Sequence, residues 1–279
     1  MTSPIQRICF NFSSSCNMRC SYCYIPFSKS AVDQDVCLRV IERCRELGTQ
    51  VITIGGGDPF VYGFLPSLVR RAREVGLETH LDTNGLRVCD RDFAWMASTI
   101  SLLGLPLDGP DDICHDRMRN AAGHFKKVLA VARRARDYGI RCKINTVVSR
   151  LNFGAISSMS PVVASLAPER WSLYQYWPLA HGELAFEIHR ISELEFRSAV
   201  GQLGTDHAAC TVEINTVASR SGRYFFVSHT GQVYTHDPFD DSRYVFLGSI
   251  FDDITIDNWH RTAQGSLRPV IVSRYSSVR

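Results

Sequence analysis

Three cysteines lie within eight residues near the start of the chain, in the sequence Cys16-Asn-Met-Arg-Cys20-Ser-Tyr-Cys23. Iron–sulfur clusters are held by cysteine sulfur, and three thiolates on one loop can bind three corners of a four-iron cube. No fourth cysteine follows closely, so one iron would keep an open position for a ligand, as catalytic zinc does. One alternative is that the three cysteines are ordinary core thiols. The other is a zinc site, but zinc needs a fourth ligand, and the first histidine of the chain is the distant His80. The spacing favours a [4Fe-4S] cluster with one open iron.

Three further segments could hold a ligand. Gly55–Pro59 (Gly-Gly-Gly-Asp-Pro) follows a β-branched run, and glycine lets the backbone approach a ligand closely. Asp82–Gly85 (Asp-Thr-Asn-Gly) follows the next such run. Taken alone, each of these two segments is also typical of a turn. The third segment, His115–Phe125, contains Arg119, a residue type that can pair bidentately with a carboxylate.

These motifs, in this order, resemble the radical S-adenosylmethionine (radical SAM) superfamily over roughly residues 5–180. The cysteine motif includes an aromatic residue, Tyr22, before its last cysteine. The resemblance implies that the amino and carboxylate groups of SAM chelate the open iron. It implies that the reduced cluster cleaves SAM to a 5′-deoxyadenosyl radical, which abstracts hydrogen from a substrate. It also implies an external electron donor of the flavodoxin or ferredoxin type.

The resemblance assigns SAM-binding roles to residues of each segment. The glycines and the aspartate of Gly55–Pro59 correspond to the GGE motif that holds the methionine ammonium of SAM, with Asp58 where glutamate is usual. The Thr-Asn pair corresponds to residues near the ribose, and the arginine to the one that pairs with the methionine carboxylate, with Arg117 as the second candidate. Pro106 departs from the family, which commonly has serine there. The implied cofactor-binding residues are Tyr22, Gly56, Gly57, Asp58, Thr83, Asn84 and Arg119.

Short β-branched runs alternate with helical patterns along the first two thirds of the chain. Asp33 should cap the first helix, and Gly48, Gly76 and Gly139 should end three of them. Six strand–helix units are too few for a closed eight-fold barrel, so we expect an α/β fold, a partial (β/α)6 TIM-type barrel over residues 5–180, with the motifs at the carboxyl ends of its strands. The expected strands are Arg7–Phe12, Gln50–Ile54, Glu78–Asp82, Thr99–Leu105, Arg141–Val148 and Arg170–Trp177, and the expected helices are Asp33–Leu47, Leu65–Val75, Asp90–Ala97, Gly123–Tyr138 and Phe153–Leu166.

The pattern changes after residue 180. A small α+β extension over residues 181–260 should cover the barrel, followed by a flexible Ser/Arg-rich tail at 261–279. The segment Ser228–Asp237 resembles the hairpin that opens SPASM and twitch extensions, but no cysteine follows Cys210, so we expect no auxiliary cluster. The expected elements are a helix at Ile191–Leu203 and strands at Ala209–Val217, Arg223–Ser228 and Gln232–Thr235.

Polar residues interrupt two strands that should be buried. Lys143, Asn145 and Gln175 need partners there, and a buried lysine suggests an anionic ligand or a structural carboxylate. Lys-Ile-Asn, then Arg-Trp, then Gln resembles the viperin branch, the nucleotide dehydratases, in which this lysine helps to bind the triphosphate. At two positions where that branch has further lysines, this chain has Val51 and Ser172. Because two positive charges are missing, the sequence favours a less highly charged nucleotide, a nucleoside or a sugar-like substrate.

Other residues could act on the substrate. His236 is a candidate substrate contact, and Tyr174 and His181 are candidate acids or bases. A radical epimerase must return hydrogen to the substrate, usually from a thiol, which could be Cys210 or Cys142. The alternative for both cysteines is a place in the core, as for the other isolated cysteines, and for the histidines a structural hydrogen bond.

Composition narrows the classes of function. The 279 residues carry 31 basic and 28 acidic side chains, and the net charge of +3 is too small to indicate a nucleic-acid or acidic-membrane partner. We find no membrane-length apolar run and no signal peptide, so we expect a cytoplasmic protein. The favoured hypothesis is a radical SAM enzyme that dehydrates a polar small molecule. The alternatives are epimerisation, dehydrogenation or decarboxylation of a secondary-metabolite intermediate, or a non-enzymatic metal-binding interaction module.

Overall fold

The computed structural model describes residues 5–26, 30–179, 183–203, 210–221, 223–237 and 240–263. His181 and most of the predicted tail lie outside these residues. The strands are β1 (Arg7–Ser13), β2 (Val51–Gly56), β3 (Glu78–Asp82), β4 (Leu102–Pro106), β5 (Cys142–Val148), β6 (Arg170–Gln175), β7 (Thr211–Asn215), β8 (Phe226–Ser228), β9 (Gln232–Asp237) and β10 (Asp240–Ser249). The helices are α1 (Gln34–Glu46), α2 (Leu65–Glu74), α3 (Asp90–Thr99), α4 (Asp112–Arg119), α5 (His124–Asp137), α6 (Ser160–Leu166), α7 (Glu183–His189), α8 (Glu193–Gly201), α9 (Val217–Arg220) and α10 (Asp253–Ala263), with 3-10 turns η1 (Pro59–Val61) and η2 (Phe153–Met159).

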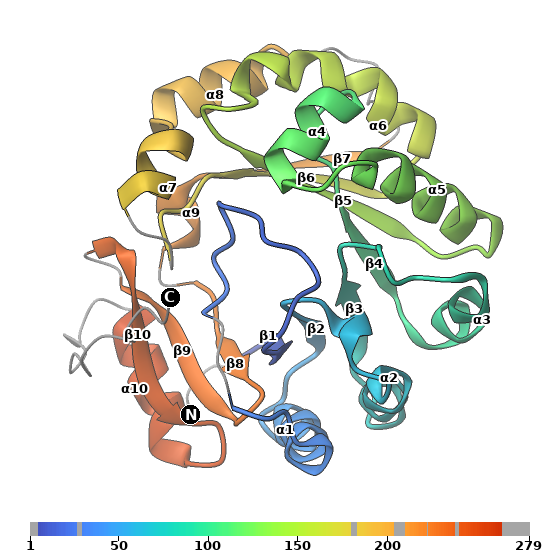
Figure 1. Ribbon diagram of the computed structural model, residues 1–279. Helices are drawn as coiled ribbons and strands as arrows, with labels where there is room; N and C mark the ends of the chain where they lie inside the picture. Colours follow the sequence, from blue (N-terminus) through green and yellow to red (C-terminus); the bar gives the residue numbers. More distant parts are fainter. Residues whose placement is uncertain are drawn as a thin grey trace.

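The strands form one curved sheet in the order β10-β9-β8-β1-β2-β3-β4-β5-β6-β7. All neighbours from β8 through β1 to β7 run parallel, and β8, β9 and β10 form an antiparallel meander at one edge. Figure 1 shows the strands as an arc with the helices outside it, and the loop after β1 reaching into the middle of the arc. The predicted partial barrel is therefore confirmed.

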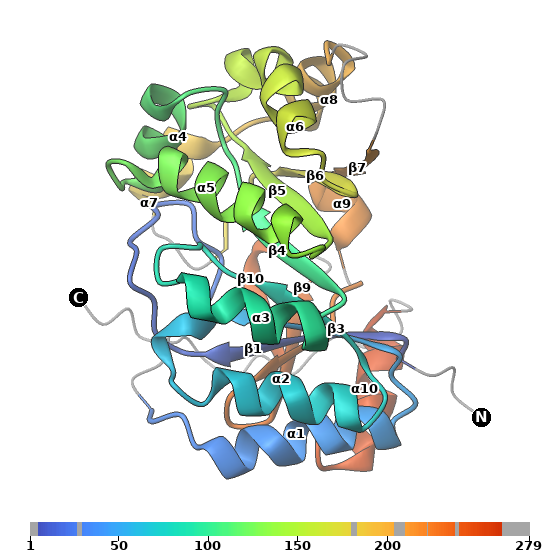
Figure 2. The same ribbon diagram turned by 90° about the vertical axis from the view of Figure 1, so that its right-hand side faces the viewer.

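The burial pattern explains which face carries chemistry. In β5, buried Cys142, Ile144, Thr146 and Val148 alternate with half-buried residues that face the inside of the arc. The outward residues pack under helices such as α5, whose apolar side is fully buried. Figure 2 shows the helices layered over the outer face of the sheet. The strands thus have one apolar face and one polar face, and the polar face lines the interior.

The C-terminal extension differs from the prediction. Instead of lying over the barrel, it continues the sheet at both edges: β7 pairs with β6, and β8 pairs with β1. Both contacts satisfy backbone groups that would otherwise remain unpaired at the sheet edges. The predicted hairpin at residues 229–231 is confirmed, because β8 and β9 pair antiparallel and Gly231 has a φ of 79°.

Within the barrel, local element types also differ from the prediction at two places. Residues 153–166 form η2 followed by α6 rather than one helix, with Pro161 in the first turn of α6. Helix α4 was not expected; Asp111 caps it by accepting a hydrogen bond from Cys114 N at 2.8 Å. No helix among the described residues is long and apolar enough to span a membrane.

Candidate active site

The inside of the sheet encloses a cavity of about 540 Å³. Its wall includes the loop after β1, with all three cysteines of the Cys16–Cys23 motif, and the carboxyl ends of the parallel strands. Catalytic residues of β/α barrels gather at this end of the strands. The structure therefore brings most of the predicted site residues to one place: Cys16, Cys20, Cys23, Tyr22, Gly56, Gly57, Thr83, Asn84, Arg119, Lys143, Asn145, Tyr174 and Gln175 all line the cavity.

The glycine motif and the cysteine loop are packed against each other. Gly57 N donates to Ser13 O at 2.8 Å, and Asp58 N donates to Ser15 O at 2.9 Å. A Cβ on Gly57 would lie 2.0 Å from Ser15 O, and Gly56 has a φ of 113°. These positions require glycine because the backbone of the cysteine loop occupies the space of a side chain.

Asp58 has a structural role that differs from the prediction. It is 0% exposed and does not line the cavity. Its Oδ2 accepts hydrogen bonds from Thr83 Oγ1 at 2.8 Å and Asn84 N at 2.7 Å, and its Oδ1 accepts from Phe60 N at 3.0 Å. Burial raises the pKa of Asp58, and these donors oppose that shift. The carboxylate therefore holds the β3–α3 loop in place instead of facing a ligand ammonium.

Asn84 links that loop to the cysteine motif. Its Nδ2 donates to Asn17 Oδ1 at 2.8 Å and lies 3.7 Å from Cys16 Sγ. Its Oδ1 accepts a hydrogen bond from Leu86 N at 2.9 Å. The amide is thereby oriented toward a cysteine sulfur, a contact that the sequence did not predict.

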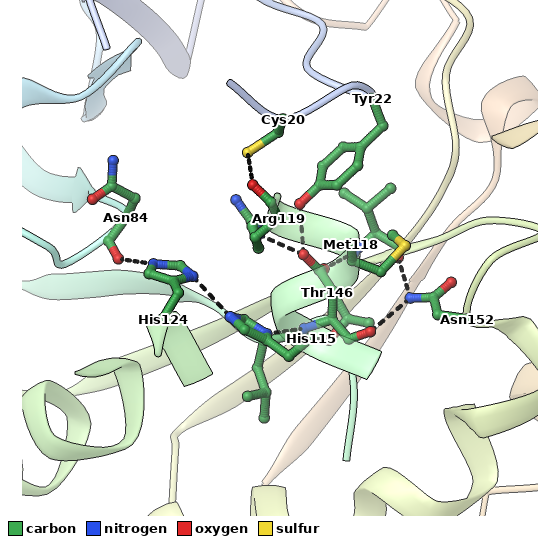
Figure 3. A network of polar contacts seen from close by, with 12 residues as sticks. Cys20, Tyr22, Asn84, His115, Met118, Arg119, His124, Thr146 and Asn152 are labelled. Atoms are coloured by element: carbon green, nitrogen blue, oxygen red, sulfur yellow. Dashed lines mark hydrogen bonds and ion pairs between the residues drawn. The ribbon is translucent and has the colours of Figure 1, made fainter. Parts of the chain in front are cut away.

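Asp108, which the sequence analysis did not single out, accepts hydrogen bonds from both Tyr22 and Arg119, which lie close together in Figure 3. It is 0% exposed, and its Oδ2 accepts hydrogen bonds from Tyr22 OH and Arg119 Nε, both at 2.6 Å. Its Oδ1 accepts from Val147 N at 2.8 Å. Burial alone would lower the pKa of Arg119, but the interactions with Asp108, Tyr22 and Cys20 together outweigh it, so the net shift is upward. Arg119 is thus a permanent cation held at the cavity wall.

Two stacked histidines connect this network to Asn84. Asp108 N donates to His115 Nδ1 at 3.0 Å, so His115 carries its proton on Nε2. That group contacts His124 Nδ1 at 2.8 Å, and His124 Nε2 contacts the Asn84 carbonyl oxygen at 2.7 Å. Burial lowers the pKa of both rings, that of His115 to about 3. Both rings are therefore neutral and carry their proton on Nε2. Each ring accepts a hydrogen bond at Nδ1 and donates one from Nε2, so the hydrogen bonds run in one direction from Asp108 N to the Asn84 carbonyl oxygen.

The opposite wall of the cavity is polar. Lys143 Nζ donates to Tyr174 OH at 2.8 Å. Burial would lower the pKa of Lys143, but Tyr174 and Asp82 outweigh it and the net shift is upward. Asp82 fills the space over Gly104, where a Cβ would lie 1.8 Å from its Oδ1. Lys143 and Asn145, both predicted site residues, line this wall of the cavity.

Several cavity residues were missed by the sequence analysis. Three are cations: Arg7, Arg170 and Arg220. Arg170 pairs with Glu213 at 3.0 Å, and Arg7 contacts His80 Nδ1 at 3.1 Å. The alternation of polar and apolar residues along β1 was a signal that could have revealed Arg7, whereas Arg220 lies beyond the predicted barrel and gave none.

Three predicted site residues take other positions. Gln175 lines the cavity, but its amide is used by backbone groups: Nε2 donates to Ile191 O at 3.1 Å and Oε1 accepts from Val217 N at 2.9 Å. His236 is 0% exposed and lies edge-on to Trp177, with ring centroids 4.3 Å apart, outside the cavity lining. Cys210 precedes β7, at the end of the strand away from the cysteine loop, and does not line the cavity.

Comparison with known proteins identifies the family. The Radical SAM superfamily model matches residues 10–153, more than half of the chain. The chain belongs to the radical SAM superfamily. The match includes the cysteine motif, the glycine motif and the network around Asp108.

Relatives within the superfamily are distant. An S-adenosylmethionine-dependent nucleotide dehydratase of Flammeovirga pacifica is 24% identical over 86% of this chain and 91% of its own length. One of Lacinutrix mariniflava is 25% identical over 83% of this chain but 51% of its own length, so this chain spans about half of that relative. The structure of Streptococcus suis SuiB bound to S-adenosylmethionine has a TM-score of 0.74 at 15% identity, over 93% of this chain and 67% of SuiB, which shows a shared fold.

The family implies a [4Fe-4S] cluster and SAM, and the residues of this radical SAM protein fit both. Met18 N lies 3.4 Å from Cys16 Sγ, a donor that favours a thiolate. Burial raises the pKa of all three thiols, that of Cys23 to about 12, so they need the charge of a bound metal to ionise. No three His, Cys, Asp or Glu side chains in the described part converge on a single metal ion.

Proposed function

We propose that this radical SAM enzyme removes water from a phosphorylated nucleoside. The observation that carries the proposal is the charge of the cavity wall. Asp108 neutralises Arg119. Arg220 donates to the backbone carbonyls of Gln175 and Thr216. Among the described residues, the rest of the wall has three cations, at residues 7, 143 and 170, and two carboxylates, at residues 82 and 213. A cavity with excess positive charge favours an anionic ligand.

Lys143 is the main candidate for holding the anionic group. It lines the cavity and makes no ion pair with a carboxylate in the described residues; Tyr174 orients it. Arg7 and Arg170 supply charge that the sequence analysis had judged lost with Val51 and Ser172. The nucleotide-dehydratase names of two relatives support the same substrate class. Of the substrate classes that the sequence left open, a nucleotide therefore suits the cavity better than an uncharged nucleoside or sugar.

When bound, SAM and the cluster supply a radical that takes a hydrogen atom from the substrate. The protein's own residues bind and orient. Lys143 attracts the phosphate groups, and Asp82, which no described side chain hydrogen-bonds, can accept a hydrogen bond from a ribose hydroxyl. Tyr174 keeps the Lys143 ammonium on the cavity side.

The test is the mass change of nucleotides incubated anaerobically with reduced enzyme and SAM. The four ribonucleoside triphosphates, the corresponding monophosphates and the free nucleosides should be compared. The expected result is loss of one water from a phosphorylated nucleoside, together with 5′-deoxyadenosine. Loss of carbon dioxide, an unchanged mass with inverted stereochemistry, or turnover of free nucleosides alone would contradict the proposal.

A further inference from the structure

One thiol outside the cluster motif faces the cavity. The seven remaining cysteines are Cys9, Cys37, Cys44, Cys89, Cys114, Cys142 and Cys210, and of these Cys9 alone is in the cavity lining. The reason is the alternation of β1, where Arg7, Cys9 and Asn11 face inward and the phenylalanines and Ile8 between them are buried in the core. The two cysteines that the sequence suggested as hydrogen donors do not reach the cavity.

The surroundings of Cys9 place its sulfur among groups from several elements. Asp82 of β3 and Lys143 of β5 are close enough to influence it electrostatically, as are Tyr24 and Tyr224. Burial, with the charge of Asp82, raises the pKa of Cys9 to about 12. The thiol therefore keeps its proton at neutral pH, and its Sγ makes no hydrogen bond with any described residue.

Two residues of the cavity wall carry buried polar atoms that lack a partner in the part of the chain that the structure describes. Trp177 is 4% exposed, and its indole N–H has no hydrogen-bond partner in the described residues; the same holds for the buried Asn145 Oδ1. Both residues line the cavity with Cys9. Buried polar groups without partners are costly, and a polar ligand that reached these atoms would satisfy them.

We propose that Cys9 donates a hydrogen atom to the substrate radical. The S–H bond breaks and a C–H bond forms, because an S–H bond is weaker than a C–H bond, and the sulfur becomes a neutral thiyl radical. One electron from a donor of the flavodoxin or ferredoxin class and one proton from solvent restore the thiol.

This inference rests on the proposed function and extends it to the product. Hydrogen abstraction, loss of water and hydrogen return convert a vicinal diol into a ketone next to a CH2 group. Without hydrogen return, loss of the hydroxyl as water and uptake of one electron from the same class of donor leave a carbon–carbon double bond instead. Both products weigh one water less than the substrate, so the fate of hydrogen distinguishes them.

The first test needs no nucleotide. Reductive SAM cleavage by the enzyme alone in D2O places the radical beside an S–D group, because thiol hydrogens exchange with solvent, whereas water does not give hydrogen atoms to carbon radicals. We expect 5′-deoxyadenosine with one deuterium from the unmodified protein, and loss of that deuterium in Cys9→Ser and Cys9→Ala. Cys210→Ala and Cys142→Ala are the matched controls and should keep it. Unlabelled product from the unmodified protein, or label that persists in Cys9→Ser, would overturn the inference.

The second test concerns the thiol itself and uses the chain without cluster or SAM. The infrared S–H stretching bands should include one that disappears in Cys9→Ala, persists at pH 10 and shifts when CTP is added. Ionisation of this group below pH 10 would overturn the inference. A nucleotide product that has lost water but carries no carbon-bound deuterium would refute the role of Cys9 and leave the dehydratase proposal intact.

Discussion

At the scale of single residues, the site is set by which buried charges have partners. Arg119 is neutralised by Asp108 at 2.6 Å, whereas Lys143 has the hydroxyl of Tyr174 and no carboxylate within hydrogen-bond distance among the described residues. An unpaired cation beside a cavity attracts an anion, while a paired one mainly holds structure. Lys143 is therefore the residue whose loss should affect substrate binding most directly.

We expect Lys143→Met to raise the KM for the nucleotide about 10- to 100-fold, the loss of one charged hydrogen bond. SAM cleavage without nucleotide should change little, since Lys143 belongs to the substrate wall. Steady-state kinetics of nucleotide loss and of 5′-deoxyadenosine formation measure the two effects. Lys126→Met, which removes a surface lysine 3.5 Å from Asp112, is the control. An unchanged KM in Lys143→Met would exclude this phosphate contact.

At the scale of elements, the loops that line the cavity are fixed by contacts with each other. The glycine motif after β2 leaves room for the cysteine loop after β1, and Asp58 joins both to the loop after β3. The ends of α4 and α5 contribute the histidine pair. Each loop would be irregular alone, because its backbone groups find partners only in the other loops.

Replacing Gly57 should displace the cysteine loop. In Gly57→Ala the new methyl group would lie 2.0 Å from Ser15 O, so the backbone must move. We expect a lower iron content after reconstitution and a loss of SAM cleavage. Gly63→Ala is the matched control, because nothing lies within 4 Å of its added Cβ. Full iron content in Gly57→Ala would show that the loop adapts.

The histidine pair should tune the cluster through Asn84. Removing the His124 ring in His124→Leu leaves the Asn84 carbonyl and His115 Nε2 without partners, which costs about 1–3 kcal/mol for each buried group. Since Asn84 Nδ2 contacts Cys16 Sγ, we also expect a shifted midpoint potential in a redox titration followed by EPR. His229→Gln, which alters a histidine bonded to Ser30 instead, is the control. A purely structural role would lower stability without moving the potential.

At the scale of the whole molecule, the C-terminal elements β9 to α10 are attached to the start of the barrel, at β1 and α1. Arg43 of α1 donates to Ile250 O at 3.1 Å and pairs with Asp253 at the start of α10. Tyr234 of β9 accepts a hydrogen bond from Asn11 Nδ2 at 2.8 Å, so the meander also reaches the inner face of β1. The extension is thereby part of the same sheet as the site.

Buried neutral histidines make the stability of the whole fold depend on pH. Burial lowers the pKa of His115 to about 3 and that of His236 to about 4, below the unfolded value of 6.5. The unfolded state therefore binds more protons below about pH 6.5, and each ring should remove about 1.4 kcal/mol of stability per pH unit down to its folded pKa. We expect the urea midpoint to fall between pH 7 and pH 5, and less steeply in His236→Gln. A midpoint independent of pH would show that both rings bind protons in the native state as readily as in the unfolded state.

The amino-acid sequence by itself determined the cysteine motif, the partial barrel and many of the residues that line the cavity. Local rules suffice for these features: Asp33 accepts hydrogen bonds from Asp35 N and Val36 N, Gly48 and Gly76 have positive φ, and each motif follows a strand. In a parallel sheet, the carboxyl ends of all strands meet at one edge, so motifs far apart in the chain converge there.

Only the tertiary structure decided which polar side chains face the cavity and which are used inside the protein. Asp58 and Gln175 stand at predicted site positions, but backbone groups of other segments take up their hydrogen-bonding capacity. Cys9 reaches the cavity and Cys210 does not, because the direction of a side chain depends on strand register and on the end of the strand where it lies. Those relations arise between segments and are absent from any local pattern of residues.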